Sequence, residues 1–289
     1  MFIQVNGAKL YFDVEGAGLV PEGTRMRAKP TLVLLHGGPS ADHTIYKPAF
    51  SALADLVQIV YLDHRGCGRS EDCSPESWNL AQWGDDVKGL CDALGIERPI
   101  VYGASFGGFV AQAYATRYPD HPGRLILTST AAKVDFNQVF DAFERIGGSH
   151  ARSVAETYWR NPTAESRAKY FETCLPLYRP RGSGQPEWVA RAIIKGDVGL
   201  HFNGPENEQG RMDYRSQLAR IPCPVLVLGG DRDPIMPLAF SETIAACLPH
   251  HLVRFECFAG CGHGVIGDDP ERAFQVMREF IATPFDPLV

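Results

Sequence analysis

Two short runs of the sequence are apolar at every position, and they constrain the fold more than any other feature. Residues 32–35 read Leu-Val-Leu-Leu and residues 225–228 read Val-Leu-Val-Leu. Along a strand with one face in water, apolar and polar side chains alternate. An uninterrupted apolar run of this length therefore indicates a strand that is covered on both faces. Such strands are typical of a parallel sheet between two layers of helices, so the chain is expected to have an α/β fold.

Predicted strands and predicted helices alternate along most of the chain. The strands are expected at 2–6, 9–15, 31–36, 57–63, 100–103, 124–129, 225–229 and 252–258, and the helices at 78–94, 106–118, 238–247 and 270–282. This alternation predicts a mostly parallel sheet flanked by helices on both faces. The first two strands are joined at Asn6-Gly7, a dipeptide typical of a tight hairpin. The polar, glycine-rich segment 16–29 is expected to be an exposed loop.

The alternation is interrupted between residues 131 and 220, which carry helical patterns but no strand pattern. A helical insertion between two strands of a sheet favours a cap over an active site, and the alternatives are a separate helical domain or a packed edge. We expect an α/β core at 1–130 and 221–289 and a helical cap at 131–220. The cap contains Phe140, Phe143, Trp159 and Trp188, which predict a partly aromatic pocket for a small molecule, with Trp159 as a candidate substrate contact.

The composition excludes several classes of partner. Of the 289 residues, 45% are hydrophobic and 21% are charged, and the formal net charge is −6. Because the basic residues are scattered, we expect no nucleic-acid or membrane partner. No signal-like segment and no bilayer-length apolar run is present, which predicts a cytoplasmic protein. The eight cysteines lack metal-finger spacing and are expected to be reduced and mostly buried. We expect no metal and no organic cofactor, and the sequence leaves the oligomeric state open.

Ser105 is the strongest candidate for chemistry. It lies in the run Gly103-Ala104-Ser105-Phe106-Gly107, between a predicted strand and a predicted helix. A Gly-x-Ser-x-Gly run in this setting is typical of a nucleophile elbow, a turn so tight that side chains two residues before and after the Ser would collide. The helix N-terminus adds free amides and a dipole that favour a developing negative charge. The alternative is a glycine-rich turn with an incidental Ser.

A Ser nucleophile needs a base, and in this arrangement an acid and then a His follow it in the chain. Of the nine His residues, His263 lies in a glycine-rich loop between the last predicted strand and the last predicted helix. From there an imidazole can reach the elbow. Two carboxylates, Asp231 and Asp233, follow the strand at 225–229. We favour Asp233 because it lies further past the strand end, and Asp231 is then a turn carboxylate or the ion-pair partner of Arg232.

Small residues follow the strand at 31–36, in the run His36-Gly37-Gly38-Pro39. They let backbone amides approach a substrate, so Gly37 is expected at the substrate and one oxyanion-binding amide is expected in this run. The other oxyanion donor is the N–H of Phe106. We interpret His36 as a packed or hydrogen-bonded structural residue. In the turn after the next strand, Asp63 and Arg65 are expected to form a structural pair.

Together these motifs resemble the proline iminopeptidase-like group (peptidase S33) of α/β-hydrolases. The matching segments are 36–39, 63–70, the elbow around Ser105, 230–233 and Gly262-His263. The resemblance covers most of the chain and is weakest in the cap. It implies the α/β-hydrolase fold and a catalytic triad of Ser105, Asp233 and His263. It also implies oxyanion amides at Gly38 and Phe106.

The sequence departs from this family at several positions. The peptidases usually have Gly where this chain has Ser40, and often have Trp or Tyr where it has Phe106. Some of them hold the free amine of the substrate with acidic residues, one of which directly follows the triad Asp. Pro234 occupies that position here.

Residues 204–208, which read Gly-Pro-Glu-Asn-Glu, resemble another amine-binding stretch of the family. Glu206 or Glu208 is therefore a candidate for holding an ammonium group, and the alternative is a solvated loop carboxylate. We expect a serine hydrolase that cleaves an amide or ester bond of a small molecule or short peptide through an acyl-enzyme, as a proline iminopeptidase-like aminopeptidase. The alternative on the same triad is a carboxylesterase or lactonase. A third hypothesis is that the protein is catalytically silent and uses this fold for binding.

Overall fold

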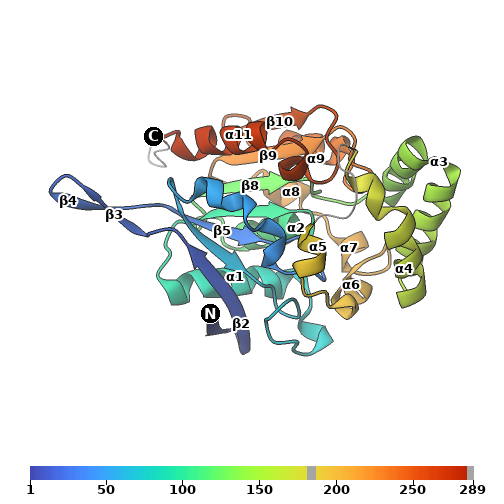
Figure 1. Cartoon of the computed structure of the whole chain (residues 1–289), viewed down its shortest axis with the longest axis horizontal. Helices are drawn as coiled ribbons and strands as arrows, with labels where there is room; N and C mark the ends of the chain where they lie inside the picture. The colour runs from blue at the N-terminus through green and yellow to red at the C-terminus, as the bar shows by residue number, and fades with distance from the viewer. Residues whose placement is uncertain (181–186, 285–289) are drawn as a thin grey trace.

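The computed structural model describes residues 1–180 and 187–284, and its centre is a sheet of eight strands (Figure 1). In sheet order the strands are β1 (Phe2–Val5), β2 (Ala8–Glu15), β6 (Gln58–Leu62), β5 (Thr31–Leu35), β7 (Ile100–Ala104), β8 (Arg124–Thr128), β9 (Val225–Gly230) and β10 (Val253–Phe258). The pairs β1–β2 and β2–β6 are antiparallel, and every pair from β6 to β10 is parallel. The predicted α/β fold with a mostly parallel sheet is confirmed.

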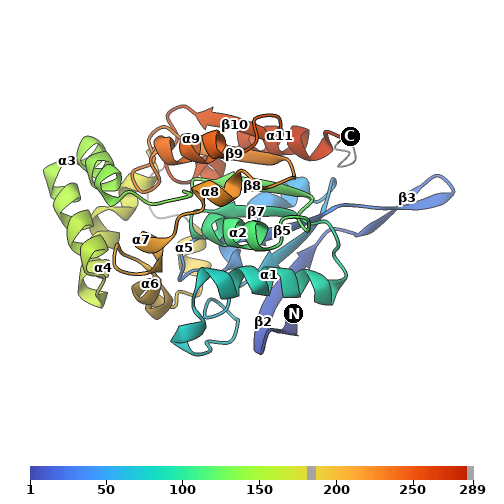
Figure 2. The same ribbon diagram turned by 180° about the vertical axis from the view of Figure 1, so that it is seen from behind.

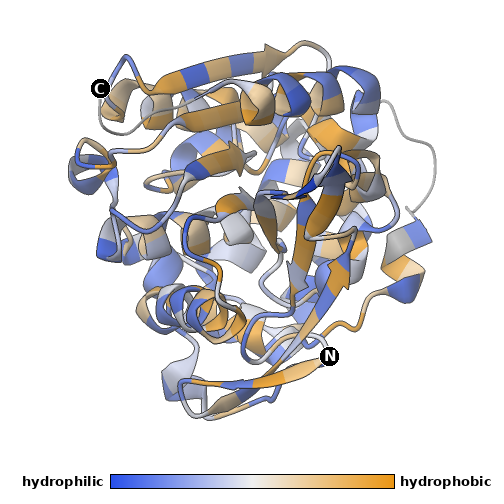
Figure 3. Ribbon diagram, turned by 90° about the vertical axis from the view of Figure 1, so that its left-hand side faces the viewer, coloured by the Kyte–Doolittle hydropathy of each residue, from blue (hydrophilic) through white to orange (hydrophobic). Residues whose placement is uncertain are grey.

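The apolar runs lie inside the sheet because each of them needs a hydrophobic layer on both sides. Val33 and Leu35 of β5 belong to one core cluster, and Leu32 and Leu34 belong to the other. Residues of α1 (Leu80–Leu94), α2 (Phe106–Arg117) and α9 (Leu238–Cys247) belong to the first cluster, together with residues of the helices between β8 and β9. The second cluster is filled by α11 (Pro270–Ala282) and the 3-10 helix η2 (Ala49–Leu53). Figure 2 shows α1 and α2 in front of the sheet, and Figure 3 shows hydrophobic strands surrounded by helices of mixed hydropathy.

Between β8 and β9 the described residues form helices and no strand. These are α3 (Phe136–Arg160), α4 (Ala164–Thr173), η4 (Leu175–Tyr178), α5 (Glu187–Arg191), α6 (Gly196–Phe202), α7 (Glu208–Arg211) and α8 (Arg215–Leu218). Gly148 has a φ of 79° and divides α3 into two helical parts. In Figure 1, α3 to α7 lie on the side to which the arrowheads of the parallel strands point. The division of the chain at residues 130 and 220 stays a prediction, and the side chain of Trp188 lies outside the described part.

The segment at 16–29 is not the loop that we expected. It forms a hairpin of β3 (Leu19–Glu22) and β4 (Arg25–Ala28), which extends away from the rest of the molecule in Figures 1 and 2. Both strands are almost entirely exposed and only four residues long. Polar and apolar residues alternate in β4 but not in β3, so no sustained strand pattern is present. Gly23 takes a φ of 61° in the turn between them.

The remaining elements are short and lie in the loops: η1 (His43–Tyr46), η3 (Pro75–Ser77) and α10 (Val265–Asp268). Within residues 1–180 and 187–284, no helix is both long enough and apolar enough to cross a bilayer. The loops after β5, β7, β9 and β10 all leave the sheet at the carboxyl edge of its parallel strands. This edge is where ligands usually bind in parallel α/β sheets.

Candidate active site

Ser105 lies at the turn from β7 into α2 in a strained backbone conformation. Its φ is 54° and its ψ is −121°, a region that residues other than Gly rarely occupy. Strain of this kind costs about 1–3 kcal/mol and persists only where the surroundings enforce it. The N–H of Ser105 donates to the carbonyl of Thr128 in β8 (3.0 Å), and its side chain does not cap the helix. The hydroxyl is therefore not committed to holding α2 in place.

Glycines at 103 and 107 make the turn possible. A Cβ at Gly103 would lie 2.2 Å from the carbonyl oxygen of Gly107, and a Cβ at Gly107 would lie 2.0 Å from the carbonyl oxygen of Leu35. Real Cβ atoms do not approach backbone this closely. The collision that the sequence predicts around Ser105 is therefore present on both sides of it.

The Gly107→Ala variant is expected to be severely destabilised. The added methyl group meets the carbonyl of Leu35 at the end of β5, and because Leu35 pairs with Gly103 of β7, it cannot move without disturbing the sheet. We expect the free energy of unfolding in urea to fall by about 3 kcal/mol or more. Gly267→Ala is the matched control, because a Cβ at Gly267 in α10 has open space and should leave stability almost unchanged. Equal stability of the two variants would contradict the tight packing inferred here.

Asp233 and His263 are brought together at the ends of neighbouring strands. Asp233 follows β9 and is buried, and its Oδ2 lies 2.8 Å from Nδ1 of His263, in the loop after β10. Its Oδ1 accepts the N–H groups of Ile235 and Met236, both at 2.9 Å. The competing carboxylate, Asp231, instead accepts the N–H of Gly260 (2.6 Å) and is exposed. Of the two predicted candidates, the structure thus pairs Asp233 with His263.

The two backbone amides predicted as oxyanion donors have no hydrogen-bond acceptor among the described residues. One is the N–H of Phe106, the first residue of α2, and the other is the N–H of Gly38 in the loop after β5. Gly37 approaches the elbow closely, because a Cβ built on it would lie 3.5 Å from Cβ of Ser105. Both predicted oxyanion donors are therefore free to bind a negative charge at this edge of the sheet.

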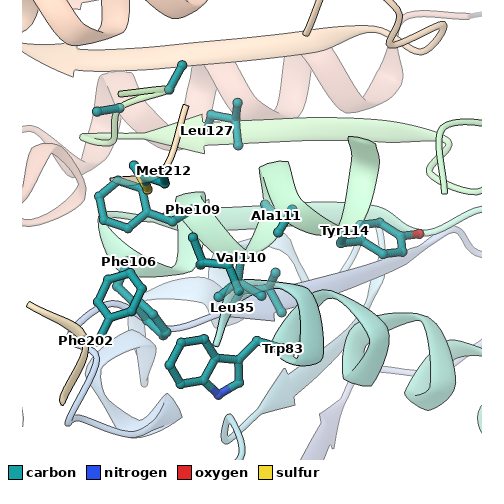
Figure 4. Packing of buried hydrophobic residues seen from close by; sticks show 14 of the residues in the cluster. Leu35, Trp83, Phe106, Phe109, Val110, Ala111, Tyr114, Leu127, Phe202 and Met212 are labelled. Carbon is teal, nitrogen blue, oxygen red and sulfur yellow. The ribbon is translucent and has the colours of Figure 1, made fainter. Parts of the chain in front are cut away.

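The side chain of Phe106 belongs to the core. Its ring centroid lies 4.8 Å from that of Trp83 and 5.2 Å from that of Phe202, a residue of α6 (Figure 4). The Phe that replaces the Trp or Tyr of the peptidases thus connects α2 to the helical segment between β8 and β9. Only its backbone N–H is available to a substrate.

Residues of the helical segment are hydrogen-bonded to the loop that carries Gly38. The N–H of Lys195 donates to the carbonyl of Ser40 (2.8 Å), and the N–H of Ile193 donates to Oδ2 of Asp42 (3.1 Å). Asp42 is fully buried and Ser40 is nearly so. The backbone carbonyl of Ser40 and the side chain of Asp42 therefore help to dock this segment beside the predicted oxyanion loop.

Tyr178 of η4 packs directly on His263, and the sequence did not single it out. The two ring centroids are 5.0 Å apart, and the carbonyl of Tyr178 accepts the N–H of His263 (2.9 Å). A Cβ at Gly262 would lie 2.2 Å from that carbonyl. The Gly before His263 was therefore the signal in the sequence that another segment packs closely against this loop. The hydroxyl of Tyr178 bonds that of Tyr170 (2.5 Å), and burial holds the pKa of both phenols well above the usual range, so both stay neutral.

The two carboxylates proposed to hold an ammonium group lie in different surroundings. Both Oε atoms of Glu208 accept the N–H of Leu80, at the start of α1 (3.1 and 3.0 Å), and burial raises the pKa of Glu208. Glu208 lines a cleft of about 720 Å³, and neither Ser105 nor His263 is among the described residues that line it. Glu206 is exposed.

Trp159 is buried in an aromatic cluster. Its ring centroid lies 4.8 Å from that of Tyr158 and 5.6 Å from that of Tyr170. The hydroxyl of Tyr170 is in turn hydrogen-bonded to the hydroxyl of Tyr178, the residue that packs on His263. Trp159 therefore lies two aromatic residues away from the predicted base.

The expected pair between Asp63 and Arg65 is wrong. Arg65 donates two hydrogen bonds to Asp86 in α1 (2.9 and 2.8 Å), and Oδ1 of Asp63 lies 2.6 Å from Nδ1 of His43. The physical reason is the turn itself. It places each side chain beside groups from a distant part of the chain: Asp63 also accepts the backbone N–H of His43, and Arg65 also donates to the carbonyl of Asn6.

Comparison with known proteins agrees with the fold described above. The protein-family model described as "alpha/beta hydrolase fold" matches residues 30–270. The chain is 27% identical to the proline iminopeptidase PfmaB of Pestalotiopsis fici, over 84% of this chain and 86% of the relative. It is 28% identical to a 2-hydroxy-6-oxononadienedioate/2-hydroxy-6-oxononatrienedioate hydrolase of Paraburkholderia phymatum, over 88% of this chain and 87% of the relative.

Among solved structures, the chain is similar to a thermophilic esterase from Thermogutta terrifontis. The TM-score is 0.67 and the identity is 25%, over 98% of this chain and 100% of the esterase. The printed names of these three proteins give three different activities: a proline iminopeptidase, a hydrolase and an esterase. The resemblance to proline iminopeptidases is confirmed at the level of the family, and the chain belongs to the α/β-hydrolase fold family.

Proposed function

We propose that the protein is a serine hydrolase with Ser105 as nucleophile, His263 as base and Asp233 as the acid that orients the base. The observation that carries the proposal is the Asp233–His263 hydrogen bond, at the same sheet edge as the strained turn at Ser105. Oδ1 of Asp233 accepts two backbone N–H groups, and an ionised carboxylate has no proton to donate, so Nδ1 of His263 carries the proton of its bond to Oδ2. Nε2 of His263 is then unprotonated and can accept the proton of Ser105.

The reaction that follows from these roles is acyl transfer. Oγ of Ser105 bonds to the carbonyl carbon of the substrate while its proton passes to Nε2 of His263. The N–H groups of Gly38 and Phe106 bind the negative oxygen of the tetrahedral intermediate. The bond to the leaving amine or alcohol then breaks, and His263 protonates that group. Water, deprotonated by His263, attacks the acyl-enzyme in the same way and releases the acid.

The direct test is hydrolysis of p-nitrophenyl acetate by the wild type and by the Ser105→Ala variant. Only the wild type is expected to turn the ester over. The same comparison separates an enzyme from a protein that uses this fold only for binding.

For the substrate we propose a small molecule with an amide or ester bond. The first candidate is an N-terminal prolyl peptide, which the similarity to a named proline iminopeptidase supports. The second candidate is an ester or acyl lactone, which two observations favour. Glu208 is already bonded to the N–H of Leu80, and Pro234 stands where some peptidases have an acidic residue.

The Glu208→Gln variant separates the two candidates. We expect it to hydrolyse p-nitrophenyl acetate within about twofold of the wild type, because an ester needs no ammonium partner and the amide oxygen can still accept from Leu80. If Glu208 binds the substrate amine, KM for Pro-β-naphthylamide should rise by about tenfold or more, because the variant loses the binding free energy of a charge-assisted hydrogen bond. An unchanged KM contradicts the amine role. Glu206→Gln tests the other candidate in the same way, and Glu172→Gln, at an exposed position of α4, is the control.

A further inference from the structure

His36, which the proposed reaction does not use, makes two hydrogen bonds that settle its protonation state. The backbone N–H of His64 points to its Nε2 (3.1 Å), and its Nδ1 lies 2.8 Å from the carbonyl oxygen of Gly37. A backbone N–H can only donate, so Nε2 must be an acceptor without a proton. Nδ1 then carries the proton and donates it to Gly37. The ring is fully buried, and this burial lowers the pKa of His36, which agrees with a neutral imidazole.

The bond to Gly37 fixes the direction of the Gly38 amide. The cis peptide bonds of the described residues are Gly38–Pro39 and Lys47–Pro48, so the peptide between Gly37 and Gly38 is trans. In a trans peptide the C=O and the N–H point in opposite directions. Because Nδ1 of His36 holds the C=O of Gly37, the N–H of Gly38 must point away from the His36 ring.

This stretch of backbone needs such a restraint. Two consecutive glycines have wide conformational freedom, and Gly38 takes a φ of 134°, where other residues are strained. A Cβ at Gly38 would also lie 2.6 Å from the N atom of Ser40. Glycine is therefore required at this position, and the bond from His36 counteracts the flexibility that glycine brings.

We propose that His36 is a positioning residue, whose Nδ1–H holds the Gly37–Gly38 peptide so that the Gly38 N–H faces the substrate oxyanion. The inference rests on the proposed function of Ser105. His36 acts only through the peptide, and it neither touches the substrate nor exchanges a proton with it. Without its bond the peptide rotates, and one of the two oxyanion donors is misdirected.

Two substitutions of His36 each retain one of its two hydrogen bonds and remove the other. In His36→Asn the side-chain NH₂ lies near the place of Nδ1 and can still donate to Gly37. In His36→Gln the side-chain oxygen lies near the place of Nε2 and can still accept from His64, but the donor to Gly37 is lost. Both variants remove the ring and its packing against His64 (4.4 Å between centroids), so both should lose stability to a similar extent.

We expect His36→Gln to lower kcat on p-nitrophenyl acetate by about 10- to 100-fold, less than the loss of a whole oxyanion donor. Its KM should stay within about threefold of the wild type, because the oxyanion forms only after substrate binding. His36→Asn should keep kcat within about threefold of the wild type, because the donor to Gly37 is retained. The inhibition constant of a trifluoromethyl ketone, which forms an oxyanion on the nucleophilic Ser, should rise in parallel with the loss of kcat.

A purely structural role of His36 predicts equal losses in the two variants, in proportion to their unfolding midpoints, and this result would overturn the inference. Equal activity of wild type and Ser105→Ala would overturn the proposed function, and the inference with it. Should either His36 variant fail to fold, ring ¹⁵N chemical shifts of the wild-type protein give the tautomer of His36 directly. A proton on Nε2 contradicts the proposal, and a proton on Nδ1 alone supports it.

Discussion

The Ser105→Ala variant is expected to lose kcat on p-nitrophenyl acetate by roughly 10⁵- to 10⁶-fold and to keep its fold. Without Oγ no acyl-enzyme forms, and the base and the oxyanion amides can only assist direct attack by water, which is far slower. Ala and Ser have similar backbone preferences, so the strained φ of 54° is retained at little additional cost. The measurement is the steady-state rate, together with circular dichroism of both proteins.

Covalent labelling makes the same test specific to the residue. A fluorophosphonate should label the wild type at Ser105, as read by mass spectrometry of the peptide, and should not label the Ala variant. Ser129→Ala is the matched control, because Ser129 also ends a strand with a positive φ, of 47°, but is buried. The Ser129→Ala control should still be labelled at Ser105. Equal ester hydrolysis by wild type and Ser105→Ala would remove Ser105 from the mechanism.

The Asp233→Asn variant is expected to lose about 10⁴-fold in kcat, although the change replaces a single oxygen by an NH₂ group. The N–H groups of Ile235 and Met236 require an acceptor, so the amide oxygen of Asn should take the place of Oδ1. The NH₂ group then faces Nδ1 of His263 and can only donate to it. His263 must therefore carry its proton on Nε2, where it can no longer accept the proton of Ser105.

Asp231→Asn is the control for this prediction. Asp231 lies two residues away, is exposed and accepts a single backbone N–H, that of Gly260. An amide oxygen can take over this role, so kcat should stay within about twofold of the wild type. If Asp231→Asn were the slower variant, the assignment of the acid would have to be exchanged between the two positions.

The parts of the candidate site that depend on the conformation of a few consecutive residues were predictable from the sequence. Gly103 and Gly107 mark the elbow because the collision that they avoid occurs within five residues of chain. His263 was predictable from chain order and from the glycine-rich loop around it. For the acid, the sequence favoured Asp233 over Asp231 but did not exclude Asp231. What separates them is that Asp233 turns inward to the N–H groups of Ile235 and Met236, whereas Asp231 faces Gly260.

Features built from distant parts of the chain were not predictable. Arg65 bonds Asp86 in place of Asp63, and Tyr178 packs on His263 across 85 residues of sequence. The exposed hairpin of β3 and β4 was missed for a different reason. Its strands bury almost nothing and have four residues each, and the alternation in β4 is too short to indicate a strand.

The sequence by itself determined the α/β fold, the mostly parallel sheet and the turn at Ser105. All three follow from apolar periodicity and from glycines whose effects are local. Only the tertiary structure decided which carboxylate meets His263, which aromatic ring covers it, and that His36 holds the Gly37–Gly38 peptide. Each of these depends on the direction of a side chain or amide in space. That direction is set by strands and loops that pack together although they lie far apart in the chain.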